Sequence, residues 1–513
     1  MECKAAGEVV FAKEVLFEGN CEQAVDIELT LPDYCPDIGR LLKCRLTPMI
    51  TSRQVNFDSL TVEGNARISV LYLDDREKKI RCCERDYPFK ASVPYDDTAE
   101  NVRLLAEAKV DYVNCRALSQ RKLDIHGAFT VHMTAVCGRQ SELVSDVEGG
   151  SLRLRRESRS ISTLVCCTQT GFDLSEAIEL GEGKAPISSV IRSCAVLCID
   201  EMTSVPGKLL VKGSAEFGMV YCTEQDADPE KLAYSIPFNQ FFDVPGIDEH
   251  CQCDLCLNCD ALDVSLRTDS DGEYRRVDVD IRVTADITAY RDADVTWISD
   301  VYSVDYEVIC AEKQMKLEKL CGTGMDRAVF RQSVDTGDVK IAGVCDVWAW
   351  VLDSRSNYRD GRIAVNGNMA VCMLLRDAAK GVVYVEKNVR FDCALPINRQ
   401  PCGSAVRPEC RVGVRNCGYT VTGDSRLELQ VEFCLSGALY EDIPVKLIDA
   451  VELDESRPKP PENRPAAVLY FAEPGEELWN IAREYNSSVE SIRQDNGIDG
   501  DTVDEGRMLI VTA

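Results

Sequence analysis

The stretch LTVEGNARISVLY at residues 60–72 alternates apolar and polar side chains around a central glycine. It returns as LLVKGSAEFGMVY at residues 209–221 and as IAVNGNMAVCMLL at residues 363–375, so that the central glycines lie 149 and 154 residues apart. Such alternation places one face of a strand in a core and the other in water. A glycine inside such a strand indicates a β-bulge or a close approach of another backbone. The body of the chain is therefore predicted to be a threefold β repeat.

A second alternating segment closes each repeat, at residues 123–131, 277–283 and 427–433. A proline follows each glycine-centred segment, at Pro94, Pro245 and Pro396, with a spacing of 151 residues each time. We expect a mainly β fold with three repeats of about 150 residues, each a pair of antiparallel β layers or a small sandwich. The predicted boundaries are 1–146, 147–305 and 306–454.

Helix is scarce in the repeats. Residues 37–44 and 186–194 are the best short candidates, because each follows or begins with a proline, which suits the first turn of a helix. A proline can equally precede a strand, so both assignments stay open.

Residues 455–465 are predicted to be a linker, since they contain four prolines within ten residues and cannot form a helix or a central strand. The segment that follows, residues 466–513, is expected to be tethered to the body and not packed against it.

This C-terminal segment contains LYFAEPGEELWNIAREY at residues 469–485, then Ile492, Asn496 and GRMLIV at residues 506–511. It resembles a LysM module, the small α+β unit (βααβ) that binds N-acetylglucosamine-containing glycans. Residues 470–472 and 508–511 would be the two strands. Leu478, Ile481, Ala482 and Tyr485 fall at helical spacing, and Ser487 or Ser488 can cap a second helix.

The resemblance implies a shallow glycan groove with Gly475, Glu476, Glu477 and Leu478 on one side and Asn496, Gly497 and Ile498 on the other. Trp479 could stack on sugar, pack in the core or face a partner. The family usually shows Gly-Asp-Thr-Leu-Trp where this chain has Gly-Glu-Glu-Leu-Trp. Ten acidic residues against three basic ones lie between Glu473 and Arg507, which would suit a basic protein surface. Glycan contact and protein contact therefore both remain open.

The stretch LPDYCPDI at residues 31–38, followed by residues 60–72, resembles the SPOCS repeat of clostridial spore-coat proteins. Three such units before a LysM module resemble a spore-coat morphogenetic protein of endospore-forming bacteria. This resemblance implies a non-enzymatic scaffold that assembles the coat with other morphogenetic proteins, in the mother-cell cytoplasm at the forespore surface. The alternatives are a peptidoglycan-binding envelope protein and a cell-wall hydrolase with an unrecognised carboxylate pair.

Composition narrows the classes of partner. A net charge of −28 over 513 residues disfavours nucleic acid and anionic lipid. No uninterrupted apolar run is long enough to form a membrane-spanning helix, so direct insertion into a membrane is not expected, and the N-terminus does not read as a signal peptide. The compartment is then expected to be reducing, with the 26 cysteines free and acting as small hydrophobic residues.

The cluster Cys251, Cys253, Cys256 and Cys259 has the spacing of a zinc site. The repeat register favours a strand instead, with Cys253 and Cys259 in the core and Cys256 on the opposite face, which is poor geometry for chelation. We therefore predict no metal and no other cofactor.

The three histidines, His126, His132 and His250, show no relation to a nucleophile, and the chain contains no phosphate loop, nucleophile elbow or zinc-protease motif. The chain is predicted not to be an enzyme.

Overall fold

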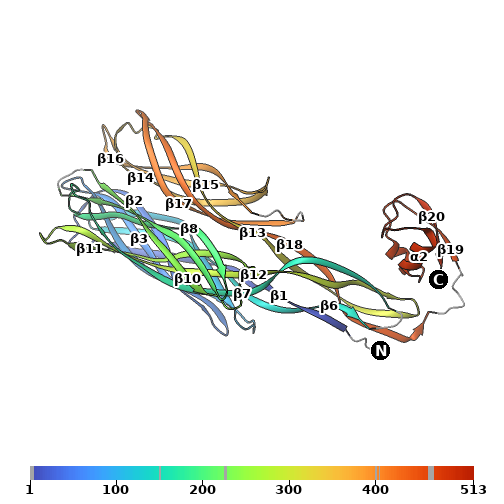
Figure 1. Cartoon of the computed structure of the whole chain (residues 1–513). Coiled ribbons are helices and arrows are strands. Elements are labelled where there is room, and N and C mark those ends of the chain that lie inside the picture. The colour runs from blue at the N-terminus through green and yellow to red at the C-terminus, as the bar shows by residue number, and fades with distance from the viewer. Residues whose placement is uncertain are drawn as a thin grey trace.

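The computed structural model describes residues 5–148, 152–224, 228–398, 401, 403, 405–459 and 467–512 (Figure 1). Each repeat contains six strands in the same order. The first has β1 (Ala5–Thr30), β2 (Ile38–Val55), β3 (Ser59–Asp74), β4 (Ile80–Pro94), β5 (Arg103–Ala117) and β6 (Lys122–Val147). The second has β7 (Leu152–Glu179), β8 (Ser189–Val205), β9 (Lys208–Cys222), β10 (Glu230–Asp243), β11 (Gln252–Thr268) and β12 (Tyr274–Ser303). The third has β13 (Tyr306–Asp335), β14 (Ile341–Arg359), β15 (Arg362–Asp377), β16 (Gly381–Pro396), β17 (Val406–Gly423) and β18 (Arg426–Pro458).

Two antiparallel sheets make up each repeat. The second, third and fourth strands form a meander, as in β2-β3-β4, and the outer strands form the other sheet, as in β1-β6-β5. The two sheets enclose one apolar core per repeat. The predicted fold class, three β-rich sandwich-like repeats, is confirmed. The two short helix candidates are strands instead: residues 38–44 begin β2, and residues 189–194 begin β8. The predicted linker falls partly outside the described residues, at 460–465, and its first residues extend β18 to Pro458.

The glycine-centred segments are β3, β9 and β15, the middle strands of the meanders. Gly64 in β3 pairs with Ile50, next to a bulge between Ile50 and Ser52 in β2. A Cβ atom on Gly64 would stand 2.1 Å from the Met49 carbonyl oxygen. The predicted close approach of another backbone is therefore confirmed, and the bulge lies in the neighbouring strand and not at the glycine.

The alternation of β3 breaks down at its end, where Val70-Leu71-Tyr72-Leu73 is buried throughout. Val70 and Tyr72 point into the core of the first repeat, whereas Leu71 and Leu73 join an apolar cluster shared by all three repeats. That cluster includes Val220 from the second repeat and Leu374 from the third. Continuous apolar runs of this kind mark strands that are covered on both faces. The three sandwiches consequently pack against one another.

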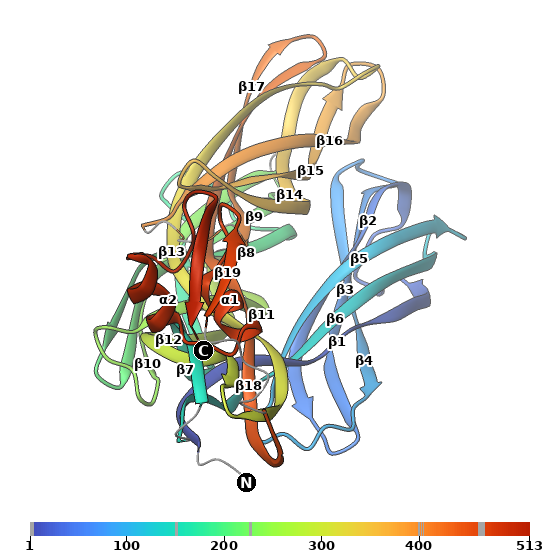
Figure 2. The same ribbon diagram turned by 90° about the vertical axis from the view of Figure 1, so that its right-hand side faces the viewer.

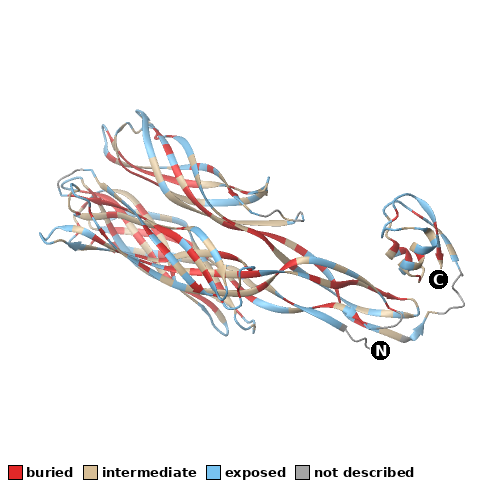
Figure 3. Cartoon of the chain, viewed as in Figure 1, coloured by how far each residue is buried: buried red, intermediate tan, exposed pale blue. Residues whose placement is uncertain are grey.

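The first and last strands of each repeat run on beyond their sandwich. Their ends form three antiparallel ribbons that pack together into a stalk, defined by residues 5–16, 137–147, 152–165, 289–303, 306–320 and 440–458. Val10, Ile161, Trp297, Leu317 and Val445 lie in one apolar cluster inside it, so every ribbon contributes to its core. Figures 1 and 3 show the stalk as an extension of the sandwiches with a line of buried residues along its interior.

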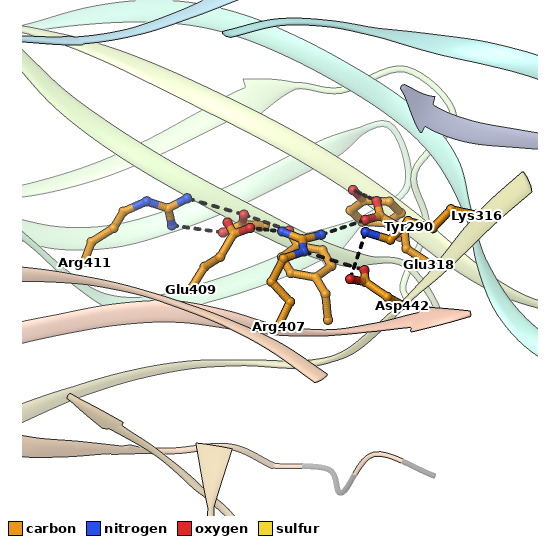
Figure 4. A network of polar contacts seen from close by, with 9 residues as sticks. Tyr290, Lys316, Glu318, Arg407, Glu409, Arg411 and Asp442 are labelled. Carbon is orange, nitrogen blue, oxygen red and sulfur yellow. Dashed lines mark hydrogen bonds and ion pairs between the residues drawn. The ribbon is translucent and has the colours of Figure 1, made fainter. Parts of the chain in front are cut away.

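A buried polar network joins the second and third repeats near the base of the stalk (Figure 4). Arg411 in β17 donates to Asp254 in β11 at 3.0 Å, and the Tyr440 hydroxyl donates to the same carboxylate at 2.9 Å. Arg407 donates to Glu318 at 3.0 Å, which also accepts from the Tyr290 hydroxyl at 2.7 Å. The buried carboxylate of Asp254 and the buried hydroxyls of Tyr290 and Tyr440 are thus hydrogen-bonded across the contact between the two repeats, as buried polar groups require.

A disulfide also links these repeats, between Cys198 in β8 and Cys434 in β18. The expectation that all cysteines are free is therefore wrong for this pair. The other described cysteines are free thiols, and all of them are buried or half-buried, in agreement with their predicted role as small hydrophobic residues.

Candidate binding site

The C-terminal module is built from β19 (Ala467–Ala472), α1 (Leu478–Glu484), α2 (Val489–Asn496) and β20 (Arg507–Thr512). The two strands pair antiparallel, and Leu478, Ile481 and Ile492 pack beneath them. Ser488 caps α2 by accepting a hydrogen bond from the Ser491 amide at 3.0 Å. The predicted order of strand, helix, helix and strand is confirmed. Within the described part of the chain, no helix has the length and apolar character needed to cross a membrane.

The first turn of the module is hydrogen-bonded to the loop that follows α2. Gly475 has φ +85°, a conformation that favours glycine, and its amide donates to the Val503 carbonyl at 2.7 Å. The Leu478 amide donates to the Asp501 carbonyl at 2.9 Å. Because residues 496–498 begin this same loop, the two predicted sides of the groove belong to one connected end of the module.

The Glu476 side chain is hydrogen-bonded within the first turn and to β19. Its carboxylate accepts from the Tyr470 hydroxyl at 2.6 Å and from the Glu473 amide at 3.1 Å. The hydrogen bond to this carboxylate, together with desolvation, raises the pKa of Tyr470 to about 12. The acidic side chain therefore helps to hold the turn against β19.

Asn496 is engaged by the module's own backbone. Its amide nitrogen donates to the carbonyls of Ile492 at 2.8 Å and Ile510 at 2.7 Å, and its Oδ1 accepts from the Ile510 amide at 2.7 Å. Gly497 has φ +62° and ends α2, and the Ile498 amide donates a hydrogen bond to the Arg493 carbonyl. The predicted site positions with an open surface are therefore Gly475 and Gly497, which are exposed, and Ile498, which is half-buried.

Glu477 and Trp479 point away from the module and onto the stalk. Glu477 accepts two hydrogen bonds from Arg155 in β7, at 2.6 and 3.1 Å. The indole nitrogen of Trp479 donates to Asp300 in β12 at 2.8 Å, and its ring meets Tyr302 edge-on with centroids 4.9 Å apart. The expectation of a tethered, unpacked module is therefore wrong. Of the three readings for Trp479, the structure shows a contact with protein, made here by the chain itself.

Sequence reasoning missed the residues of the stalk that receive the module, Arg155, Asp300 and Tyr302. Arg155 is separated from Glu477 by 322 residues, and no local pattern marks such a pair. Only a general indication of these residues was present in the sequence. The acidic excess of the module indicated a basic protein surface as its partner, and Arg155 is a basic residue of that surface.

Cys253, Cys256 and Cys259 lie on β11, as their register predicted, and Cys251 directly precedes that strand. Cys253 is in the core of the second repeat and Cys259 packs against that core, whereas the Cys256 thiol lies near Asn258. Burial raises the pKa of both Cys253 and Cys259 to about 11. Among the residues that the structure describes, no three His, Cys, Asp or Glu side chains are grouped so as to hold a metal ion.

His126 and His132 lie on the exposed face of β6. His126 Nδ1 is 2.7 Å from Asp26, and Nε2 is 3.0 Å from Asp124. The hydrogen bond with Asp26 and then that with Asp124 raise the pKa of His126. Both ring nitrogens are thus occupied by carboxylates, one from β1 and one from β6 itself, an arrangement that ties β6 to β1.

Comparison with protein-family models identifies the SPOCS domain of SipL at residues 37–118 and 186–267, and the LysM domain at residues 472–512. The SPOCS matches span β2 to β5 and β8 to β11, so the long strands of the stalk lie outside them. The third repeat lies outside these two ranges and has the same strand order and sheet pairing. Both domain types are binding modules.

Among curated proteins, a 46-residue segment is 44% identical to the probable autolysin SsaALP of Staphylococcus aureus (strain NCTC 8325 / PS 47). That segment covers 9% of this chain and 17% of the relative, so the chain spans only about a sixth of that protein. No solved structure matches the chain significantly. The matched domains, the shared architecture of the repeats and the βααβ module agree, and the chain therefore contains two SPOCS domains and a C-terminal LysM domain.

Proposed function

We propose that this chain is a non-enzymatic scaffold for assembly of the spore coat, and that its LysM module recruits a partner to it. The observation that carries the proposal is the joining of three sandwiches and a stalk into one body with a recognition module at the end of the stalk (Figure 2). Such a body carries the module at the end of the stalk, apart from the three sandwiches (Figure 1). The combination of SPOCS and LysM domains supports a role in sporulation.

The proposed partners are spore-coat morphogenetic proteins, with N-acetylglucosamine glycan of peptidoglycan as a second ligand. The LysM domain and the autolysin-like match support glycan binding in the cell envelope. The contact of Glu477 and Trp479 with the stalk supports protein binding, because it shows that this face of the module can complement a protein surface. The proposed place of action is the mother-cell cytoplasm at the forespore surface.

A fluorescent fusion of the full chain in a sporulating endospore-former tests this proposal. We expect a ring of fluorescence at the forespore, and loss of that ring when residues 467–512 are deleted while the repeats accumulate to the same level. Uniform fluorescence from the intact fusion throughout sporulation would contradict the proposal.

Peptidoglycan binding in the cell envelope is a second candidate function, favoured by the match to a probable autolysin. It predicts that purified chain co-sediments with cell-wall sacculi and that N-acetylglucosamine oligomers release it. A cell-wall hydrolase would instead release soluble sugar from the sacculi over hours, and we expect no such release.

A further inference from the structure

The end of the stalk and one face of the LysM module form a complementary pair of surfaces. The stalk surface consists of Arg155, Asp300, Tyr302 and Lys459, and the docking face of the module consists of Glu477, Trp479, Arg483, Asn486 and Ser487. These contacts cross between β7, β12 and the residue after β18 on one side and α1 with the residues flanking it on the other.

Each side of this contact contributes one cation and one anion to it. The stalk cation Arg155 donates two hydrogen bonds to the module anion Glu477, whereas the stalk anion Asp300 accepts from Arg483 at 2.7 Å and from Trp479 at 2.8 Å. Paired opposite charges of this kind set one orientation, since rotating the module would bring like charges together.

An aromatic residue completes the contact. Tyr302 is only 4% exposed, and it lies in the same apolar cluster as the core of the module. Its ring meets Trp479 edge-on, and its hydroxyl donates to the Ser487 carbonyl at 2.8 Å. A tyrosine at the end of a stalk would be open to water if the module were absent, so the stalk surface is shaped for an occupant.

We propose that the end of the stalk is a docking site for the chain's own LysM module, and that docking blocks one wall of the module's ligand groove. The groove-blocking part rests on the proposed function, because Glu477 and Trp479 are groove positions only through the likeness to LysM. A ligand that engages these two side chains competes with Arg155 and Asp300, and binding therefore releases the module.

The contact between the module and the stalk suits a reversible association. Arg155 and Glu477 each retain 37% of their side-chain exposure, so salt screens their attraction. Eight residue steps separate Lys459 from Ala467, so these two residues can lie at most about 29 Å apart. A short tether keeps the released module at high effective concentration near the stalk, which lets weak contacts hold it without preventing exchange with a ligand.

Hydrogen–deuterium exchange on the full chain tests the docking. The double variant Arg155→Glu with Asp300→Lys changes only the stalk and leaves the module intact. We expect faster exchange in residues 298–304 and 478–487 in this variant. The control double variant, Arg159→Glu with Asp294→Lys, makes the same two charge changes at exposed positions of β7 and β12 outside the contact, and it should leave both segments unchanged. Adding Glu477→Arg to Arg155→Glu should restore protection. Unchanged exchange in the stalk variant would overturn the proposal.

Titration with the N-acetylglucosamine tetramer tests the competition in the same full-length proteins. If nine-tenths of the wild-type module is docked, the stalk variant should bind the tetramer about tenfold more tightly. Equal affinities with a released module would overturn the blocking of the groove. Absence of binding in every form would overturn both that blocking and the glycan part of the proposed function, whereas the exchange experiment would still decide the docking.

Discussion

The ring of Phe89 lies across the β3–β4 pair from Gly64 and fills the space where a side chain on Gly64 would stand. A Cβ on this glycine would be 2.8 Å from the phenyl ring and 2.1 Å from the carbonyl oxygen of Met49. The second and third repeats contain the same pair, as Gly213 with Phe238 and Gly367 with Phe391. The ring covers a glycine that would otherwise leave a gap in the core, and the bulge in the neighbouring strand approaches from the other side.

Replacing Gly213 by alanine should therefore destabilise the chain by about 3 kcal/mol, at the upper end of the cost of overpacking. The added Cβ would stand 2.2 Å from the Cys198 carbonyl, which is backbone and cannot move away cheaply. Chemical denaturation followed by fluorescence measures the change. Gly218→Ala in the same strand is the matched control, because its Cβ would meet only the Cys194 sulfur at 3.3 Å. Equal losses for the two variants would contradict this account.

Alternation and glycine spacing predicted the repeats because both are local signals that recur in every repeat. The Phe partners lie on the strand that follows Gly64 or Gly213, and strand pairing brings each of them opposite its glycine, a relation that no single strand reveals. The stalk was missed for a similar reason. Its strands continue without a turn from β structure in the sandwich, and only packing between repeats distinguishes residues such as Val10 from those of a sandwich core.

Asp254→Asn should cost about 2 kcal/mol at neutral pH, because it removes the charge that pairs with the half-buried Arg411 guanidinium and weakens its hydrogen bonds. Burial alone would raise the pKa of Asp254, but the charge of Arg411 and hydrogen bonds from Arg411 and Tyr440 outweigh it and lower the pKa. A lowered carboxyl pKa stabilises the fold above the unfolded value of about 3.9, and this stabilisation is lost as pH falls through the folded value. The difference in the free energy of unfolding between wild type and variant should thus become smaller below about pH 4.

Urea unfolding at a series of pH values measures that difference. Asp294→Asn, at an exposed position of β12, is the control and should be close to wild type throughout. A difference that stays constant from pH 7 to pH 3 would show that the Asp254 charge is not what stabilises the contact between repeats.

Reduction of the Cys198–Cys434 disulfide should lower the unfolding midpoint. The bond closes a loop of 236 residues, and the chain-entropy model gives an upper value of about 5 kcal/mol for such a loop. Peptide mapping without reductant should recover the two cysteines in one cross-linked peptide. The Cys198→Ser with Cys434→Ser variant should match the reduced wild type and should no longer respond to reductant. A mapped bond to any other cysteine would contradict the pairing.

Cys253 and Cys259 should react with iodoacetamide at pH 7.5 at least about tenfold more slowly in the folded chain than in urea, because the thiolate is the reactive form and burial raises the pKa of both thiols to about 11. Cys115 gives an internal reference in the same digest, since a hydrogen bond from the Cys44 thiol lowers its pKa. Stoichiometric zinc that is released on labelling would instead assign the protection to a metal site.

The βααβ order of the module followed from the sequence, since its helices and caps are local. The contacts that its side chains make did not follow from the sequence. Likeness to LysM places Asn496 and Glu477 together as groove residues, yet Asn496 bonds to β20 and Glu477 bonds to Arg155 in β7, a strand of the second repeat. Distinguishing these roles requires the backbone positions, because an amide or a carboxylate suits a sugar, a main chain or an arginine equally well.

Asn496→Ala should consequently unfold or loosen the module and not merely weaken a ligand. It removes hydrogen bonds to the backbone of Ile492 and Ile510, with an expected loss of about 2–3 kcal/mol. Exchange of residues 467–512 in the full chain should rise, while exchange in the repeats stays the same. Asn480→Ala, at an exposed position of α1, is the matched control and should leave the module protected. If Asn496→Ala keeps full protection and loses only binding to N-acetylglucosamine oligomers, then its amide faces the ligand and not β20.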